Sequence, residues 1–368
     1  MDTKRIKIGI THGDVNGIGY EVILKTLSDE RMTDFCTPII YGLQKIMLYH
    51  QKTMELPSIN FKIINKPEEA ADGKINLINC GDDNLKIEFG RSSAEVGKAA
   101  FAALEMAAAD LKRGAIQTIL TAPVNKSNIK RDELNFTGHT EYLETIFGED
   151  GKYKAIMIMI YDSLRIALVT THIPMSDVNA RLTKESIVEQ LTVFNKALIQ
   201  DFNVIKPCIA VLALNAHAGD NGLLGNEETS VIIPAIAEAE KKGITVFGPY
   251  PADGFFGSQS HHKFDGILAM YHDQGMIPFK LLAMENGVNY TAGLPIVRTS
   301  PSHGTAYDIA GKNMASEVSF RNALYESIDI FRQRQFYQEM KSNPLHKHYV
   351  DKSGDNVKLD LTIDDSNE

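Results

Sequence analysis

Three short apolar segments each run directly into a histidine, and the three residues are His172, His217 and His272. The segments are rich in Ile, Val, Leu and Ala and show no polar alternation, as buried strands of a parallel sheet do. Because ligands bind beyond the carboxyl ends of strands in open parallel sheets, three imidazoles arriving there could meet at one point. With coordination positions left open for water or substrate, such a set is typical of a catalytic metal rather than a structural one.

A histidine at the end of a strand also has an ordinary structural interpretation. Taken singly, such a residue is more often part of a turn or a hydrogen-bonded core group than a metal ligand. Three histidines at the same position after three strands are less easily explained by coincidence. A metal site and structural histidines therefore both stay open as alternatives. The other histidines are interpreted differently: His50 is expected on the surface of a helix, and His346 and His348 near a solvated tail.

The elements that must position these residues alternate along the chain. Short apolar runs predict buried strands at Ile6–Thr11, Thr37–Tyr41, Thr118–Thr121, Ile156–Tyr161, Leu164–Thr170, Cys208–Leu214 and Gly266–Tyr271. Helical patterns cover Val96–Lys112, Lys184–Asp201, Glu227–Lys242 and Ser319–Lys341. Ser92 and Glu95 have the spacing of a capping box before the first helix, and Thr183 can cap the second. Pro234 implies a kink or a late start in the third. Strands that alternate with helices predict an α/β fold with a mainly parallel sheet.

Composition and charge restrict the classes of function. The chain has 368 residues, of which 43% are hydrophobic and 23% charged, the balance of a globular protein. Its formal net charge of −9 offers no general surface for nucleic acid or anionic lipid, so any phosphate must be bound by a local basic cluster. The three cysteines contain no CxxC pair, which favours a reducing compartment. With no membrane span or signal peptide recognised, a cytoplasmic location is expected.

Two glycine-containing loops are candidates for binding an anion or a cofactor. Gly13–Gly19 follows a predicted strand and precedes a helix, a position suited to an anion at a helix N-terminus. The loop lacks the GxGxxG spacing, and a tight structural turn explains it equally well, so no Rossmann dinucleotide site is predicted there. The better cofactor candidate is His303–Asn313, whose glycines and small residues would let the backbone approach an adenosine.

A series of motifs in a fixed order resembles one family of enzymes. The motifs are Gly13-Asp14-x-x-Gly17-Ile18-Gly19-x-Glu21, Thr137-Gly138-His139-Thr140-Glu141, Thr171-His172-Ile173-Pro174, Asn215-x-His217-Ala218-Gly219, Gly248-Pro249-x-Pro251-Ala252-Asp253, Met270-Tyr271-His272-Asp273-Gln274-Gly275, Gly293-Leu294-Pro295-x-x-Arg298-Thr299-Ser300 and His303-Gly304-Thr305-Ala306-x-Asp308-Ile309-Ala310-Gly311. From the first strand to roughly Gln335, the chain resembles the 4-hydroxythreonine-4-phosphate dehydrogenases of vitamin B6 biosynthesis. The last motif is also similar to the NAD loop of isopropylmalate and isocitrate dehydrogenases, whose two-domain fold that family shares.

The resemblance implies a role for each matched residue. It implies metal ligands at the three histidines described above, and substrate contacts at His139, Thr140, Lys280, Asn289 and Arg298. It implies NAD contacts in the last motif, at Gly304, Thr305 and Asp308, with NADP as an alternative cofactor. Zinc suits neutral imidazoles best, while magnesium, cobalt and manganese stay open. In that family the site is completed across a dimer interface, so a homodimer whose subunits share each metal is expected.

The fold that the resemblance implies has two α/β/α domains with mainly parallel sheets, like isopropylmalate dehydrogenase, and an active site in the cleft between them. The first domain is expected to comprise residues 1–130 plus 290–345. The second, 131–289, would carry the metal ligands and the dimer contacts. Residues 346–368 form an acidic tail, in which Asp351–Glu368 contains six acidic residues and two lysines, and no chemistry is assigned to it.

The implied reaction is the NAD-dependent oxidation of 4-phosphohydroxy-L-threonine to its 3-keto acid, which decarboxylates to 3-amino-2-oxopropyl phosphate in pyridoxal 5'-phosphate biosynthesis. Lys280 and Arg298 would supply the positive charge that a phosphate or carboxylate needs on an acidic protein. Lys280 could instead be the base that takes the hydroxyl proton, and Asp253 is a second candidate. Asp253 and Asp273 could also orient the metal ligands.

The chain departs from the family pattern at a few positions. Val15 and Asn16 stand where the family usually has Pro-Ala, Tyr20 replaces a usual proline, and Ala216 stands where the histidine motif often has proline. No ligand is lost, but the substrate stays open, because close relatives oxidise 4-phospho-D-threonate or 4-phospho-D-erythronate. A three-histidine metal lyase or aldolase without a redox step is an alternative from another class and would not bind NAD. A non-catalytic sugar-phosphate binder would need no metal.

Overall fold

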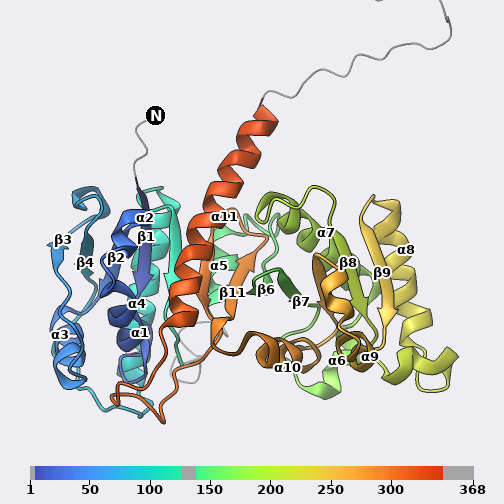
Figure 1. The fold of residues 1–368 in the computed structure, drawn as a ribbon, viewed down its shortest axis with the longest axis horizontal. Coiled ribbons are helices and arrows are strands. Elements are labelled where there is room, and N and C mark those ends of the chain that lie inside the picture. Colours follow the sequence, from blue (N-terminus) through green and yellow to red (C-terminus); the bar gives the residue numbers. More distant parts are fainter. Residues whose placement is uncertain (1–4, 126–137, 343–368) are drawn as a thin grey trace, which may run out of the picture.

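The computed structural model describes residues 5–125 and 138–342, and within these ranges it shows one mixed sheet flanked by helices. The twelve strands run in the order β3-β4-β2-β1-β5-β12-β11-β6-β7-β10-β8-β9 across an elongated molecule (Figure 1). The predicted α/β class with mainly parallel strands is confirmed. The sheet is continuous, which differs from the expectation of separate sheets in two domains, because β12 and β11 join its two halves.

The strands in each outer half of the sheet are parallel to one another. In the first half they are β1 (Ile6–Thr11), β2 (Cys36–Gly42), β3 (Phe61–Ile64), β4 (Ile75–Asn79) and β5 (Thr118–Thr121). In the second half they are β7 (Leu164–Leu168), β8 (Cys208–Leu212), β9 (Thr245–Tyr250) and β10 (Gly266–Ala269). Every residue of β2 and β5 is buried, as expected for strands covered on both faces, whereas the edge strand β3 is half exposed.

Antiparallel pairing is confined, among the described strands, to the centre of the sheet. There β11 (Val288–Ala292) pairs with β12 (Arg298–Pro301) and with β6 (Ile156–Tyr161), and β6 pairs with β7. Strand β12 is parallel to β5, so a late segment of the chain lies beside the first half. The domain division at 1–130 plus 290–345 and 131–289 stays a prediction, and the acidic tail lies outside the described residues.

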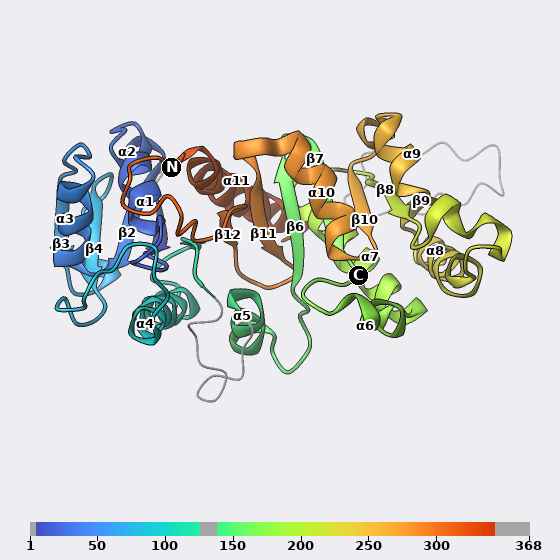
Figure 2. The same ribbon diagram turned by 90° about the horizontal axis from the view of Figure 1, so that it is seen from below.

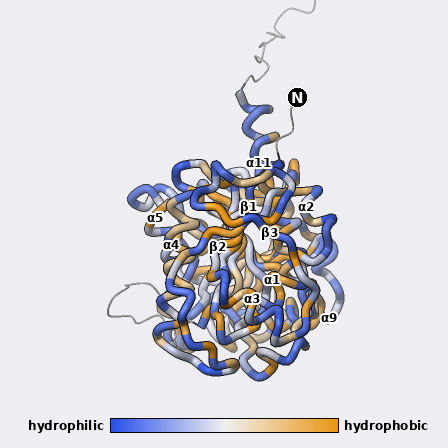
Figure 3. The backbone as a smooth tube through the Cα atoms, turned by 90° about the vertical axis from the view of Figure 1, so that its left-hand side faces the viewer, coloured by the Kyte–Doolittle hydropathy of each residue, from blue (hydrophilic) through white to orange (hydrophobic). Residues whose placement is uncertain are grey.

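Helices cover both faces of the sheet. They are α1 (Gly19–Leu27), α2 (Met32–Phe35), α3 (Gln44–Thr53), α4 (Ala94–Lys112), α5 (His139–Phe147), α6 (Met175–Arg181), α7 (Lys184–Gln200), α8 (Ile233–Lys241), α9 (Ala252–Gly257), α10 (His272–Ala283) and α11 (Val318–Ser342). Figure 2 shows α4 and α5 on one side of the sheet and α1 and α11 on the other. Figure 3 shows the apolar strands β1 and β2 within a more polar outer layer, with the end of α11 projecting from the body. None of the described helices has both the length and the apolar character needed to cross a membrane.

Local sequence signals determine several helix ends. The side chain of Thr183 accepts a backbone hydrogen bond at the start of α7, which confirms that predicted cap. The cap of α4 is displaced by one residue from the prediction, because Ser93 rather than Ser92 accepts from Val96 N, at 3.3 Å. Pro234 lies in the first turn of α8, directly after a π-helical turn at Glu228–Ile232, so the predicted helix begins near Glu227 and becomes α-helical only at Ile233.

A buried stack of rings explains one departure from the family pattern. Tyr20 lies between His12 and His50, with ring centroids 5.4 and 5.2 Å away, and its hydroxyl accepts a backbone N–H at 2.7 Å. The surface position expected for His50 is wrong, because His50 shares the buried face of α3 with Ile46 and Met47. Burial lowers the pKa of both histidines from 6.5 to about 4.

Acid is expected to destabilise the protein through His12 and His50. The unfolded chain protonates a histidine near pH 6.5 and the folded protein only near pH 4, so the free energy of unfolding falls as pH decreases through that window. The loss by pH 5 amounts to about 2 kcal/mol per histidine. Urea unfolding followed by circular dichroism at several pH values would measure it. The variant His50→Phe should lose less stability over this range, and a loss equal to that of the unmodified protein would contradict the assignment.

Candidate functional site

A buried arginine lies where the two halves of the sheet join. Arg298, the first residue of β12, is 4% exposed. Its Nε and Nη2 atoms donate to Thr121 Oγ1 at 3.1 and 2.6 Å, and its Nη1 donates to Thr291 Oγ1 at 3.1 Å. The two threonines belong to the neighbouring strands β5 and β11. Within the part of the chain that the structure describes, the hydrogen-bond partners of this guanidinium include no carboxylate, so no ion pair balances its charge.

The first turn of α5 approaches this guanidinium. Arg298 Nη2 lies 3.1 Å from His139 Nδ1, and Thr140 follows in the same turn. Backbone N–H groups in the first turn of a helix have no partner within the helix and favour anions. Burial lowers the pKa of Arg298 to about 10, while the charge of Glu141 acts in the opposite direction. A cation held out of water beside a helix N-terminus is an arrangement suited to binding an anion.

Two further predicted substrate residues flank β12. Asn289 lies on β11 opposite Ser300, and among the described residues its buried Oδ1 has no hydrogen-bond partner. Lys280, on α10, donates to the carbonyl of Ser302, directly after β12. Partial burial lowers the pKa of Lys280. The structure thus places both residues beside the strand that carries Arg298.

The candidate cofactor loop packs on the first glycine loop. Ile18 N donates to Thr305 O at 3.1 Å, and the Tyr307 hydroxyl donates to Asp14 Oδ2 at 2.6 Å. A side chain at Gly17 would bring its Cβ to 2.8 Å from Thr305 O, so glycine permits this approach. The first glycine loop therefore supports the cofactor loop, a role that the sequence did not predict.

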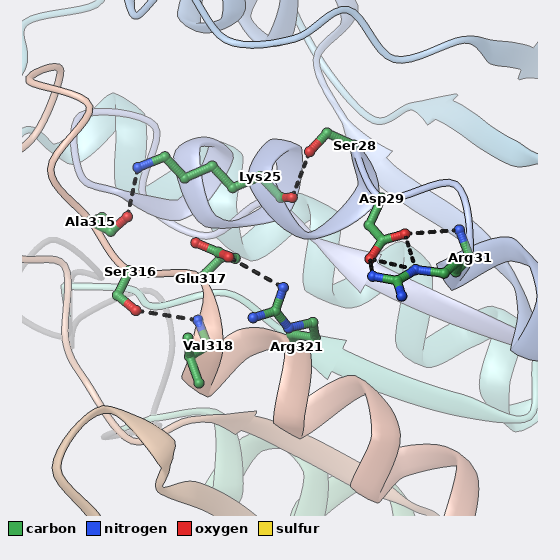
Figure 4. Close-up of polar contacts among 9 residues, drawn as sticks. All are labelled: Lys25, Ser28, Asp29, Arg31, Ala315, Ser316, Glu317, Val318 and Arg321. Carbon is green, nitrogen blue, oxygen red and sulfur yellow. Dashed lines mark hydrogen bonds and ion pairs between the residues drawn. The ribbon is translucent and has the colours of Figure 1, made fainter.

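The far end of the cofactor loop is tied to α1. Lys25 Nζ donates to Ala315 O at 2.7 Å (Figure 4). Ala315 N donates to Glu21 Oε1 at 2.7 Å, and Glu21 and Lys25 form an ion pair at 2.8 Å. The predicted cofactor residue Asp308 is exposed between these anchors, and Gly304 is exposed directly before them. The loop thus presents accessible residues on a backbone that is held at both ends.

The three histidines follow three adjacent parallel strands. Strand β10 lies between β7 and β8, so the carboxyl ends of these strands share one edge, as the sequence pattern predicted. The rings of His172 and His272 have centroids 5.8 Å apart. His217 does not complete a set with them, because the described residues of one chain contain no group of three side chains arranged to hold a metal ion. Imidazole nitrogens are suitable ligands for a divalent metal ion, but a single chain brings only two of the three histidines close together.

His217 lies on a left-handed turn. The five residues His217–Asn221 have φ values of 52°, 53°, 80°, 42° and 57°. Outside glycine, asparagine and aspartate this conformation costs about 1–2 kcal/mol per residue, so the strain falls on His217 and Ala218. Such strain persists only where surrounding contacts impose it.

Two aspartates predicted near the metal ligands differ in their contacts. Asp273 Oδ1 lies 2.7 Å from His272 Nδ1, which would leave the Nε2 atom of His272 for a metal ion. Asp253 is exposed in the first turn of α9. Only Asp273 is therefore seen in contact with a predicted ligand.

Some residues of the site were missed in the sequence. Thr121 ends a predicted strand, so its position was a usable signal for a polar group at the sheet edge. Thr291 lies in a strand that no apolar run predicted, and Tyr307 occupies an unspecified position of the last motif. No signal in the sequence indicated the contact of Thr291 with Arg298 or that of Tyr307 with Asp14.

Comparison with known proteins gives a consistent result. The family model described as "Pyridoxal phosphate biosynthetic protein PdxA" matches residues 34–327. A 4-hydroxythreonine-4-phosphate dehydrogenase from Bacteroides thetaiotaomicron is 54% identical over 366 residues, which cover 99% of this chain and 100% of that protein. A D-threonate 4-phosphate dehydrogenase from Cupriavidus necator is 38% identical and covers 89% of this chain and 98% of its own length.

Solved structures agree with these matches. The crystal structure of 4-hydroxythreonine-4-phosphate dehydrogenase from Klebsiella pneumoniae superposes with a TM-score of 0.77 at 33% identity, covering 90% of this chain and 99% of that one. A terephthalate 1,2-cis-dihydrodioldehydrogenase from Burkholderia xenovorans, at 22% identity and a TM-score of 0.56, shares the fold. Because the family model matches most of the sequence and the Bacteroides relative matches nearly all of it, the chain belongs to the PdxA family of pyridoxal phosphate biosynthetic proteins.

Proposed function

We propose that this protein is an NAD-dependent and divalent-metal-dependent dehydrogenase that oxidises 4-phosphohydroxy-L-threonine to its 3-keto acid, which decarboxylates to 3-amino-2-oxopropyl phosphate. The predicted 4-hydroxythreonine-4-phosphate dehydrogenase activity, in pyridoxal phosphate biosynthesis, is confirmed by the family model and the 54% identical relative. The detailed proposal rests on the buried guanidinium of Arg298, which forms no ion pair with a carboxylate among the described residues. An anionic substrate would supply the missing charge.

A substrate that bears both a phosphate and a carboxylate needs two positive regions. Arg298, with His139 and Thr140 in the first turn of α5, would form one of them. Lys280 would form the other, beside Ser302 at the opposite end of β12 from Arg298. Asn289 Oδ1, buried and without a partner among the described residues, would accept a hydrogen bond from the substrate's hydroxyl or ammonium group.

Lys280 is the proposed base. Its lowered pKa increases the fraction of neutral amine near neutral pH, and the neutral Nζ can accept the proton of the substrate's C3 hydroxyl. Asp253 stays the alternative base. NAD⁺ held by residues 303–313, through Gly304, Thr305 and Asp308, would accept the hydride, with NADP as the alternative cofactor.

The three strand-end histidines, His172, His217 and His272, would hold the metal ion. Zinc suits their imidazoles best, and magnesium, cobalt or manganese would have the same function. Bound there, the ion would make the substrate hydroxyl more acidic and would stabilise the negative charge left by decarboxylation. Since one chain gathers only part of the set, the proposal includes a homodimer whose subunits share each metal.

The helix that begins at His272 supports the proposed dimer. Its outer side and the residue after it expose large apolar side chains: Ile277 is 60% exposed, Leu281 71% and Met284 75%. Apolar side chains gathered on one outer surface are typical of a subunit interface. A dimer formed across α10 would bring the interface next to a proposed metal ligand.

One assay tests the substrate and the metal together. NADH formation should be fastest, by kcat/KM, with 4-phosphohydroxy-L-threonine and slower with 4-phospho-D-threonate and 4-phospho-D-erythronate. Removal of metal by a chelator should abolish it, and added zinc or cobalt should restore it. NADH formation with the threonate alone would show that the substrate is that of the Cupriavidus relative. A metal-loaded protein that shows neither an NAD-induced thermal shift nor NADH formation would favour a lyase or aldolase.

A further inference from the structure

A buried carboxylate lies under the left-handed turn that carries His217. Glu228 is 2% exposed, and among the described residues it forms no ion pair with a lysine or arginine. It lies eleven positions after His217 in the sequence, in a single π-helical turn, Glu228–Ile232, that precedes α8. Since a buried charge is costly unless hydrogen bonds satisfy it, the partners of this carboxylate indicate what it does.

Those partners all belong to the segment between β8 and His217. Glu228 Oε1 accepts hydrogen bonds from the backbone N–H groups of Leu214 and Asn215, both at 2.8 Å. Its Oε2 accepts from the side-chain amide of Asn215 at 3.0 Å. Two backbone donors converging on one carboxylate oxygen fix the direction in which the chain leaves the strand. The turn begins two residues after Asn215, at His217.

The turn itself passes close to the same carboxylate. At Gly219, with φ +80°, an added Cβ would lie 2.6 Å from Glu228 Oε2, so only glycine fits between the turn and the acid. His217 and Ala218 have no such freedom, yet both adopt positive φ. Contacts around the turn must therefore hold them: Glu228 fixes the chain at Asn215, two residues before His217, and Leu224 N donates to Gly219 O at 3.0 Å on the other side.

A neighbouring carboxylate extends this network to another proposed ligand. Glu227 Oε2 accepts from Asn215 Nδ2 at 2.7 Å, and Glu227 Oε1 accepts from Asn179 Nδ2 at 2.8 Å. Asn179 lies on α6, the helix that follows His172. Glu227 and Glu228 thus connect α6, which follows His172, to the segment that precedes His217.

We propose that Glu228 is a positioning residue for metal binding, which acts by imposing the left-handed turn that directs the imidazole of His217. The proposal rests on the metal site of the proposed function. Groups that orient metal ligands typically change metal affinity by about 10–100-fold when they are removed. Glu228 would act on the backbone of the ligand rather than on its ring.

The test compares metal affinity with stability in the full-length protein. Chelator competition would give the Co²⁺ dissociation constant, the visible spectrum of bound Co²⁺ would report its coordination, and thermal unfolding would report stability. Glu228→Ala should weaken Co²⁺ binding by about 10-fold or more and change the spectrum. Glu228→Gln keeps an oxygen for the two backbone donors but turns an NH₂ group toward Asn215, so it should restore affinity in part.

Asp265 provides a matched control at the opposite end of β8. Its Oδ2 accepts from Cys208 N at 2.8 Å, so it also bonds the backbone of that strand, far along it from His217. Asp265→Ala should lower the thermal midpoint and leave Co²⁺ affinity unchanged. Unchanged Co²⁺ affinity in both Glu228 variants would overturn the positioning role while leaving the metal site standing. If His217→Ala binds Co²⁺ as well as the unmodified protein does, the proposed metal site fails, and this inference fails with it.

Discussion

Replacement of Arg298 by methionine is expected to lower kcat/KM by about 10³-fold or more, because the substrate's anionic group loses a charged, forked donor in a buried site. The fold should survive the change. A buried charge without a counter-ion opposes folding, so the thermal midpoint should stay the same or rise. Steady-state kinetics of NADH formation and thermal unfolding of the same samples would measure both effects. Activity lost together with an unchanged or raised midpoint would be direct evidence for a functional charge.

Two further variants separate charge from geometry at this position. Arg298→Lys keeps a positive charge but lacks the planar fork that reaches Thr121 and Thr291 together, so its loss of activity should be intermediate. Arg165→Met serves as a control, because Arg165 is also partly buried but stacks over the Phe202 ring, with 4.6 Å to its centroid. That variant should keep its activity. Full activity in Arg298→Met would show that the guanidinium does not bind substrate.

Removal of the Arg334 side chain is expected to cause the largest loss of stability, about 3–5 kcal/mol. Arg334, on α11, pairs with Asp201 at 2.6 Å and donates to the Tyr290 hydroxyl at 2.7 Å and to two backbone carbonyls. Arg334→Leu would leave Asp201, which is 1% exposed, as an unpaired buried charge. Urea unfolding at neutral pH would measure the loss in the free energy of unfolding.

A second substitution distinguishes the ion pair from simple packing. Asp201→Asn combined with Arg334→Leu removes both charges, so the double variant should be more stable than Arg334→Leu alone. Catalytic activity per folded molecule should be unchanged in both, since none of the proposed substrate contacts involves this pair. A double variant that is no more stable than the single one would show that lost packing, and not the unpaired acid, sets the cost.

The strands that the sequence predicts are those that contain a run of mostly apolar residues. Strands β1, β5, β6, β7, β8 and β10 all fall within predicted segments. Strand β12 was not predicted, because its four residues, Arg-Thr-Ser-Pro, contain no apolar run and yet are all buried. Its polar groups are satisfied by distant partners, such as the Ala323 carbonyl that accepts from Thr299 Oγ1 at 2.7 Å. A four-residue strand that is stabilised in this way leaves no periodic pattern to detect.

Parts of the candidate site could be predicted from local sequence patterns, and other parts could not. The strand-end position of the three histidines follows from local apolar runs, and the order β7-β10-β8 confirms that their strands are neighbours. The left-handed turn at His217 could not be predicted, because it depends on a buried acid in a later element. Arg298 was identified only through the family resemblance, since a single arginine in an unpredicted strand has no local signal.

The pairing of β12 with β5 has a consequence for protein synthesis. Arg298 bonds a threonine 177 residues earlier in the chain and lies near a histidine 159 residues earlier. A nascent chain that has completed the first five strands has β1 on one side of β5, but it lacks the anion site and the β12 neighbour on the other side. All four residues of β5 are buried in the finished protein. That apolar edge stays open on the ribosome until β12 emerges, which makes it a target for chaperones and for misassembly between chains. The site and the protection of this edge are then gained in the same folding step.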